Sequence, residues 1–328
     1  MTFALRIQNL TRRFGNLVAV DNLSFDIRQG EVFGLLGPNG AGKTTTLSML
    51  ATMLAPTSGS ATVNGISIAE DPDGVRKSIG IVFQDQSLDE ELTAAENMDF
   101  HGRLYRIPSD IRNPRITKLL TLVELNDRRN DIVKTFSGGM RRRLEIARGL
   151  LHHPSVLFLD EPTLGLDPQT RNHLWQYIAA LAKEKGITII LTTHYMEEAD
   201  RLCSRVAIID HGKIIALDSP QNLKEGVGGD VVTLKSEHCH AIAETLDEPW
   251  LSRMEEHDGT VTLSMKNAEQ HISGIITLLA SKGIPVESVS IHKPTLEDVF
   301  LYFTGKTIRE EESDPRDMVR MFQRKAGR

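Results

Sequence analysis

The stretch Gly37-Pro38-Asn39-Gly40-Ala41-Gly42-Lys43-Thr44 decides the fold class of this chain. An apolar run at 32–36 precedes it and residues 45–50 follow it, which predicts a buried strand, a glycine-rich turn and a helix. The glycines allow the main chain to wrap phosphate groups, so we expect these eight residues and Thr45 to line a nucleotide site. Lys43 is expected to reach the β- and γ-phosphates, and the Thr44 hydroxyl to bind Mg²⁺. The stretch therefore predicts an α/β fold of the P-loop NTPase (RecA-like) type.

Two carboxylates end a second predicted strand. Residues 156–159 are wholly apolar, as in a strand buried on both faces of a parallel sheet, and Asp160 and Glu161 follow directly. Ligands of such sheets bind at the carboxyl ends of the strands. Asp160 is expected to hold Mg²⁺, directly or through water, and Glu161 to accept a proton from water attacking the γ-phosphate. The alternative is that Asp160 and Glu161 are two surface acids at a strand end, and the presence of the phosphate loop makes this alternative the less favoured one.

Three single residues fit the same site. Gln84 follows the apolar run 79–83, where its amide could sense Mg²⁺ or the attacking water. His194 ends the apolar run 188–193 and could contact the γ-phosphate. Phe14 lies ahead of the first strand-rich segment and could stack on adenine. Each residue alone is more often structural, but the even spacing of Gln84 and His194 on successive strands favours the functional reading.

The turn Ser137-Gly138-Gly139 predicts a second anion site. Its glycines let N–H groups converge, and Ser137 is expected to cap a helix starting near Met140, whose N-terminus carries partial positive charge. A phosphate bound by the chain's own loop need not reach this turn. This indicates that the nucleotide at the turn comes from a second copy of the chain. The basic cluster at 141–143 is expected to face acidic neighbours or solvent.

These motifs together resemble an ABC transporter ATP-binding subunit. The resemblance covers about the first two-thirds of the chain, with six separated motifs in order, including Leu166-Asp167. Residues 135–143 and 294–300 resemble the daunorubicin/doxorubicin-resistance type of exporter ATPase. Phe136 and Met140 depart from the usual Leu and Gln of the general family, and Phe14 replaces the commoner Tyr.

The resemblance implies an ATPase that uses ATP and Mg²⁺ and works as a dimer, which we expect to be a homodimer. Each ATP would lie between Lys43 of one copy and Ser137 of the other, with Asp167 crossing the interface. Such exporter ATPases pair with a separate type-2 ABC permease at the cytoplasmic face of the cell membrane. The transported compound is expected to be hydrophobic or antibiotic-like, although the permease would determine it.

Other functions remain open at this point. Importer ATPases share every core motif, so export rests on the two exporter-like segments. A non-transport ABC ATPase acting on a macromolecular machine is the further alternative. A ribosomal one would normally carry two cassettes, and a chromosome-handling one would need a long heptad insert. A non-catalytic module would be expected to have lost Lys43, Glu161 or His194, and all are present.

Composition limits the partners. The net charge of −6 and the pI near 6.0 show no overall excess of positive charge of the kind that binds nucleic acid, so no nucleic acid partner is expected. We expect neither a signal peptide nor a run of the roughly 20 apolar residues that span a bilayer. Another polypeptide would then supply any path across a membrane.

The chain is expected to contain two domains and a tail. Residues 1–225 would form the ATP-binding domain, with an antiparallel sheet from about 5 to 63. A helical lobe at about 86–135 would include helices at 94–105 and 115–124. Residues 226–305 have a βαββαβα pattern that predicts a small α/β domain for regulation or for stabilising the ATPase pair. The charged residues 306–328 are expected to be a mobile tail.

Overall fold

The computed structural model describes residues 2–246, 248–257 and 259–305. The chain forms two compact units, Met1–Leu217 and Asp218–Arg328. The division lies N-terminal to the boundary expected at 225, because α8 (Pro220–Glu225) packs against α11 (Leu296–Thr304) of the second unit. The expected mobile tail, 306–328, lies outside the described residues.

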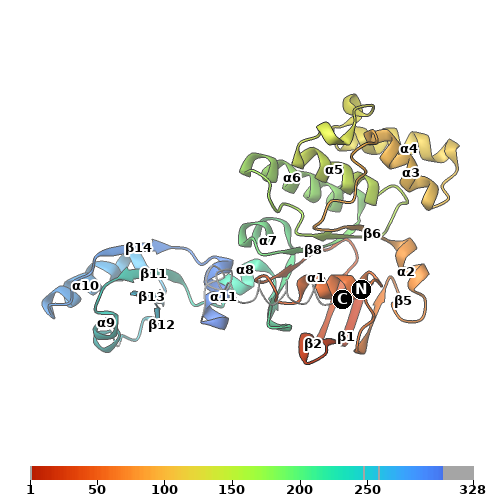
Figure 1. Ribbon diagram of the computed structural model, residues 1–328. Coiled ribbons are helices and arrows are strands. Elements are labelled where there is room, and N and C mark those ends of the chain that lie inside the picture. Colours follow the sequence, from red (N-terminus) through yellow and green to blue (C-terminus); the bar gives the residue numbers. More distant parts are fainter. Residues whose placement is uncertain (1, 247, 258, 306–328) are drawn as a thin grey trace. The chain divides into compact units, whose positions relative to one another are not determined.

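A six-stranded sheet in the order β10-β9-β3-β8-β7-β6 forms the centre of the first unit (Figure 1). β3 (Val32–Leu36) pairs in parallel with β8 (Thr188–Thr193) and β9 (Arg205–Asp210). β7 (Val156–Asp160) pairs in parallel with β8 and with β6 (Ile79–Val82), while β10 (Lys213–Asp218) forms the opposite edge. Every residue of β3, β7 and β8 is buried, which explains their continuous apolar runs and confirms the predicted parallel strands.

A second, antiparallel sheet in the order β2-β1-β4-β5 completes the core of this unit. β1 (Phe3–Phe14) forms a long hairpin with β2 (Leu17–Arg28) and pairs on its other side with β4 (Ser58–Val63). A tight turn at Asn64-Gly65, both with positive φ, leads to β5 (Ile66–Ser67). Apolar side chains of α1 (Lys43–Leu50) share one hydrophobic core with both sheets. The short α2 (Pro72–Ser78) then leads into β6.

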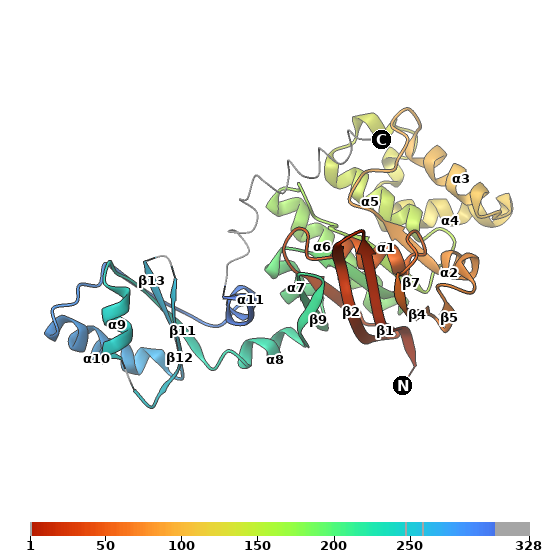
Figure 2. The same cartoon turned by 60° about the horizontal axis from the view of Figure 1, so that its bottom comes forward.

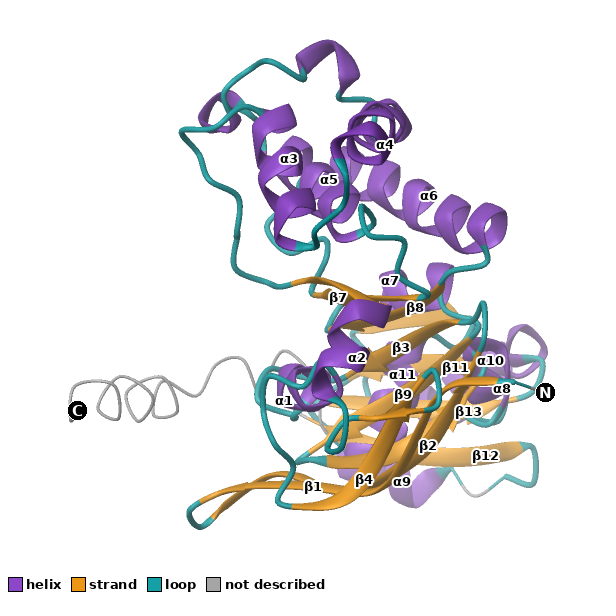
Figure 3. Ribbon diagram, turned by 90° about the vertical axis from the view of Figure 1, so that its right-hand side faces the viewer, coloured by secondary structure: helices purple, strands orange, loops and turns teal. Residues whose placement is uncertain are grey.

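A group of helices lies on the side of the six-stranded sheet away from α1 (Figure 3). They are α3 (Ala94–Leu104), α4 (Ser109–Leu122), α5 (Gly138–Gly149) and α6 (Pro168–Lys185), with 3₁₀ turns η1 (Asn126–Arg128) and η2 (Val133–Thr135) before α5. The seventh helix of the unit, α7 (Met196–Leu202), follows β8. Buried Met98, Leu120 and Leu144 belong to one lobe core, so α5 is part of the helical lobe expected at 86–135.

One helix boundary differs from the expectation. α4 begins at Ser109, before the helix expected at 115–124, and it contains Pro114. A proline inside a helix removes one hydrogen bond and argues for a break. Burial of Arg112, Ile116 and Leu120 along one side of α4 holds the helix together across that position.

The second unit is a small two-layer α/β domain with the expected βαββαβα order after α8. Its antiparallel sheet runs β12-β13-β11-β14, with β11 (Asp230–Lys235), β12 (Leu251–His257), β13 (Thr260–Met265) and β14 (Ser288–His292). Helices α9 (Cys239–Thr245) and α10 (Ala268–Ser281) pack their apolar sides against the sheet (Figure 2). A capping box between Thr295 and Asp298 starts α11, within the exporter-like segment 294–300.

No helix within the described residues is both long enough and apolar enough to cross a membrane.

Candidate nucleotide-binding and hydrolytic site

The phosphate loop joins β3 to α1, and its conformation requires glycine. Gly40 and Gly42 have φ values of +86° and +102°. A Cβ at Gly37 would lie 2.1 Å from the carbonyl oxygen of Ile209, and one at Gly42 would lie 2.4 Å from that of Ala19. Any larger residue would collide with main chain, so only glycine permits this loop. The loop can thereby turn its N–H groups toward an anion.

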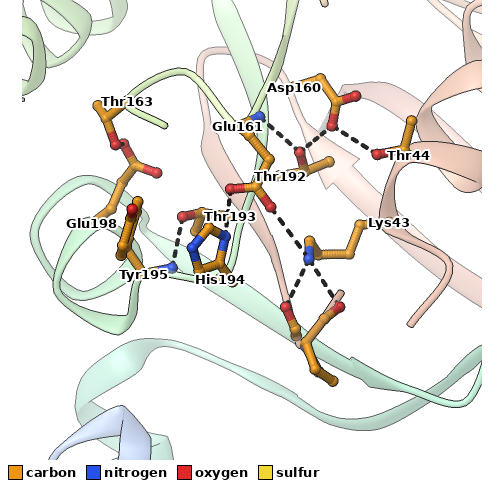
Figure 4. A network of polar contacts seen from close by, with 12 residues as sticks. Lys43, Thr44, Asp160, Glu161, Thr163, Thr192, Thr193, His194, Tyr195 and Glu198 are labelled. Atoms are coloured by element: carbon orange, nitrogen blue, oxygen red, sulfur yellow. Dashed lines mark hydrogen bonds and ion pairs between the residues drawn. The ribbon is translucent and has the colours of Figure 1, made fainter. Parts of the chain in front are cut away.

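Lys43 is held at the centre of the site. Its Nζ donates to the carbonyl oxygens of Gly37 at 2.7 Å and Pro38 at 3.0 Å. The same atom lies 3.3 Å from Glu161 Oε1 in a buried ion pair. The lysine charge is therefore aimed at the loop and compensated by a carboxylate from the end of β7 (Figure 4).

Asp160 lies where β7 meets the phosphate loop. Its Oδ1 accepts a hydrogen bond from Thr44 Oγ1 at 3.1 Å and another from Thr192 Oγ1 on the neighbouring strand β8. Burial raises the pKa of Asp160, although these two hydrogen bonds oppose the effect. Thr44 and Asp160 thus place hard oxygen ligands side by side, the donor set that Mg²⁺ prefers.

Glu161 adopts an unusual backbone conformation that aims its carboxylate into the site. Its φ is +47°, in the left-handed region that costs a non-glycine residue free energy, and such strain clusters at functional sites. Its amide donates to Thr192 Oγ1 at 3.0 Å and to the Thr192 carbonyl at 3.2 Å. The neighbouring strand therefore holds the strained residue in place.

The carboxylate of Glu161 lies between two basic groups. His194 Nδ1 is 2.9 Å from Oε2, while Lys43 is near Oε1. Burial raises the pKa of Glu161, but the hydrogen bond with His194 and the charge of Lys43 outweigh it and hold the pKa below its usual value. Since an ionised carboxylate can only accept, His194 Nδ1 carries the proton of this bond. Glu161 is ionised at neutral pH, as a proton acceptor must be.

Gln84 and Phe14 lie at the ends of their strands with exposed side chains. Gln84 follows β6 within two residues. Phe14 ends β1 and is 43% exposed, with the Arg12 guanidinium 4.6 Å from its ring centroid. An exposed aromatic face beside a cation suits stacking on a base.

The Ser-Gly-Gly turn and Asp167 form a second group at two helix N-termini. Ser137 caps α5 by accepting from the Met140 amide at 3.3 Å, which confirms the predicted cap. Asp167 caps α6, and hydrogen bonds from Thr170 lower the pKa of its carboxyl. A Cβ on Gly139 would lie 2.2 Å from Thr170 Cγ2. Glycine at 139 therefore lets the starts of α5 and α6 approach closely.

The basic cluster at 141–143 corrects one expectation. Arg141 and Arg143 face the acidic side chains Glu90 and Glu124, as expected. Arg142 instead points inward, is 7% exposed, and pairs with buried Glu145 one turn along α5. The i, i+3 spacing of opposite charges was the signal for this pair.

Two further buried residues escaped sequence reasoning. Thr192 bridges Asp160 and the Glu161 amide, as described above. Glu198 of α7 accepts from Thr163 Oγ1 and Trp175 Nε1, each at 2.9 Å, and burial raises the pKa of its carboxyl. It therefore joins the turn after Glu161 to α6 and α7. Figure 4 shows Glu198 beside Thr163 of that turn.

Comparisons with known families match both units. A family model described as "ABC transporter" matches residues 20–164. A second, described as "ATP-binding protein DrrA1-3-like, C-terminal domain", matches residues 219–304.

Individual proteins match over most of the chain. The daunorubicin resistance ATP-binding protein DrrA2 of Streptomyces coeruleorubidus is 37% identical, over 95% of this chain and 98% of its own. The linearmycin resistance ATP-binding protein LnrL of Bacillus subtilis (strain 168) is 39% identical, over 93% and 100%. A solved dimeric structure of the ATP-binding cassette MJ0796 in a post-hydrolysis state, bound to ADP and Pi, superimposes with a TM-score of 0.59 at 27% identity. It covers 66% of this chain and 98% of its own.

Proposed function

This chain belongs to the DrrA-like family of ABC transporter ATP-binding proteins, which hydrolyse ATP to drive transport, and we propose that it powers export of a hydrophobic, antibiotic-like compound. The names of its relatives support this substrate class, since two of them confer resistance to daunorubicin and linearmycin. ABC ATPases dimerise and pair with membrane permease subunits. Here we propose a separate type-2 permease, with the chain bound at the cytoplasmic face of the cell membrane.

We propose that the loop residues 37–45 hold the phosphates of ATP, with Lys43 on the β- and γ-phosphates. The glycine-dependent loop and the buried Lys43 support this role. Thr44 and Asp160 would hold Mg²⁺, with Gln84 as a further ligand or sensor at the end of β6. Bound Mg²⁺ would supply positive charge beside the phosphate oxygens. Phe14 would stack on the adenine base.

The ionised carboxylate of Glu161, set between Lys43 and His194, is the observation that carries the hydrolytic assignment. Glu161 would take a proton from the water that attacks the γ-phosphate. His194 would orient Glu161 through its Nδ1–H and contact the γ-phosphate. Movement of Glu161 is limited, because Oε2 is hydrogen-bonded to His194, Oε1 is ion-paired with Lys43, and the amide donates to Thr192.

We propose a homodimer in which each ATP lies between the phosphate loop of one copy and the Ser137-Gly138-Gly139 turn of the other. The exposed Ser137 and Gly138 at the N-terminus of α5 support this, because a helix N-terminus favours bound anions. Asp167 would cross near the partner site from the N-terminus of α6. The second unit would regulate or stabilise this pair.

Glu161→Gln tests the assignment. The amide keeps the shape of the side chain but cannot accept the proton, so turnover should fall by about 10²–10⁴-fold while ATP binding is kept. The matched control is Glu197→Gln, whose carboxylate lies on the exposed side of α7 and pairs with Arg201. Steady-state hydrolysis and equilibrium ATP binding are measured on both. Hydrolysis by Glu161→Gln at the rate of Glu197→Gln would refute the role of Glu161.

A further inference from the structure

Arg142 is a buried charge that none of the roles above uses. It lies on α5, five residues after the Ser137 cap, and its side chain is 8% exposed. An arginine stays charged even when buried, so each of its N–H donors needs an acceptor. The guanidinium finds them almost entirely on the main chain of the hydrolytic site.

Its contacts converge on the residues around Glu161. Nη2 donates to the carbonyl oxygens of Asp160 at 2.6 Å and Glu161 at 3.2 Å, and Nε donates to that of Pro162 at 3.0 Å. These are three consecutive carbonyl groups at the end of β7, and the middle one belongs to the residue with φ of +47°. The guanidinium therefore holds the main chain on either side of the strained position.

The same side chain also holds the Gln84 loop. Nη1 donates to the carbonyl oxygen of Phe83, the residue before Gln84. Glu145 Oε2 accepts from Nη1 at 3.0 Å, and its other oxygen accepts from the Ser87 amide at 2.8 Å. The Arg142–Glu145 pair thus binds the loop on both sides of Gln84 from one helix.

Close packing of α5 fixes the position of Arg142 relative to β6 and the Ser-Gly-Gly turn. A Cβ on Gly80 of β6 would lie 2.3 Å from the carbonyl oxygen of Gly149, at the end of α5. The helix is therefore in close backbone contact with β6 at one end and carries the Ser137 turn at the other. Arg142 lies between them.

We propose that Arg142 is a positioning residue for ATP hydrolysis, which fixes the main chain at Glu161 and the Gln84 loop relative to the Ser-Gly-Gly helix. It acts through carbonyl groups and touches no reacting atom. The proposal rests on the roles proposed for Glu161 and Gln84. Lysine cannot replace it, because a single ammonium group does not reproduce the planar fork of donors that reaches four carbonyl groups.

The test measures kcat for ATP hydrolysis and the Kd for ATP separately on the full chain, with rates normalised to titrated ATP-binding sites. Arg142→Gln should lower kcat by about 10²-fold, as expected for misplaced catalytic groups, with the Kd for ATP changed less than about threefold. Arg142→Lys should restore little of that loss. Glu145→Gln keeps an acceptor for Ser87 but removes the countercharge, so its kcat should fall by about tenfold or less.

Arg143→Gln is the matched control, because Arg143 is adjacent on α5 and bonds to the Val123 carbonyl and Glu124 on the lobe. It should keep the wild-type kcat. Equal kcat values for Arg142→Gln and Arg143→Gln would overturn the proposal. If Arg142→Gln does not fold, a wild-type kcat in Arg142→Lys overturns it instead. Glu161→Gln is assayed in the same way. A wild-type kcat in Glu161→Gln refutes the role of Glu161 as the base. A wild-type kcat in the Arg142 variants, with Glu161→Gln inactive, refutes only the positioning role of Arg142.

Discussion

Thr192→Val would probe the polar site without removing a charge. Thr192 is fully buried, its Oγ1 donates to Asp160 Oδ1, and it accepts from the Glu161 amide at 3.0 Å. Valine keeps the shape and loses both bonds. A hydrogen bond to a charged group contributes about 1.5–3 kcal/mol, whereas the Glu161 amide retains the Thr192 carbonyl at 3.2 Å. We expect the unfolding free energy of the first unit to fall by about 2–3 kcal/mol.

The size of this loss should depend on pH. Burial raises the pKa of Asp160 above its ordinary 3.8, so its ionisation costs stability as the pH rises through the native pKa. The Thr192 hydrogen bond favours the ionised form and reduces that cost. Thr192→Val raises the native pKa further, and its destabilisation should therefore be larger at neutral pH than near the ordinary pKa of 3.8.

Urea unfolding followed by tryptophan fluorescence measures this effect in one unit. The chain has two tryptophans, Trp175 and Trp250. In a Trp250→Phe background the fluorescence comes from buried Trp175 and therefore follows unfolding of the first unit. Thr188→Val is the matched control on the same strand, because the Thr188 hydroxyl accepts from the neutral Gly30 amide at 3.0 Å. The control should lose about 1 kcal/mol at every pH. The reasoning is refuted if Thr192→Val loses no more than Thr188→Val and shows no pH dependence.

Two other perturbations follow from the first unit. Gly139→Ala should lower ATP hydrolysis, because its Cβ would lie 2.2 Å from Thr170 Cγ2 and force α5 away from α6. Thr170→Ser removes the Cγ2 methyl group, so the double variant should hydrolyse ATP at a rate close to that of Thr170→Ser alone. A double variant as slow as Gly139→Ala contradicts this explanation. Burial, with the charge of Arg148, lowers the pKa of His101 from 6.5 to about 4, so stability should be lost as the pH falls from 6.5 toward 4. His101→Phe should reduce the fall in unfolding free energy over that range, and an unchanged slope would show that His101 is not its source.

Local sequence was enough to predict the elements that present the site. The phosphate loop depends on glycines that its own turn requires, and β7 depends on an unbroken apolar run before Asp160. The Ser137 cap was predictable for the same reason, since capping involves residues within one turn of the helix. Each of these signals is contained within a few consecutive residues.

Most contacts of the supporting residues could not be predicted, because the partners are distant in sequence. Thr192 reaches Asp160 only because β8 lies beside β7. Arg142 is buried only because α5 packs over the ends of two strands, and a run of three arginines read alone favours solvent. The left-handed conformation of Glu161 likewise has no marker in its own sequence.

Capture of the transport partner tests the central claim most directly. Tagged Glu161→Gln protein is purified with ATP from detergent-solubilised native membranes, and the proteins that accompany it are identified by mass spectrometry. A chain that drives transport through a separate permease should bring down a polytopic membrane protein in stoichiometric amount. Ribosomal proteins or DNA in its place, without any membrane protein, would contradict the account.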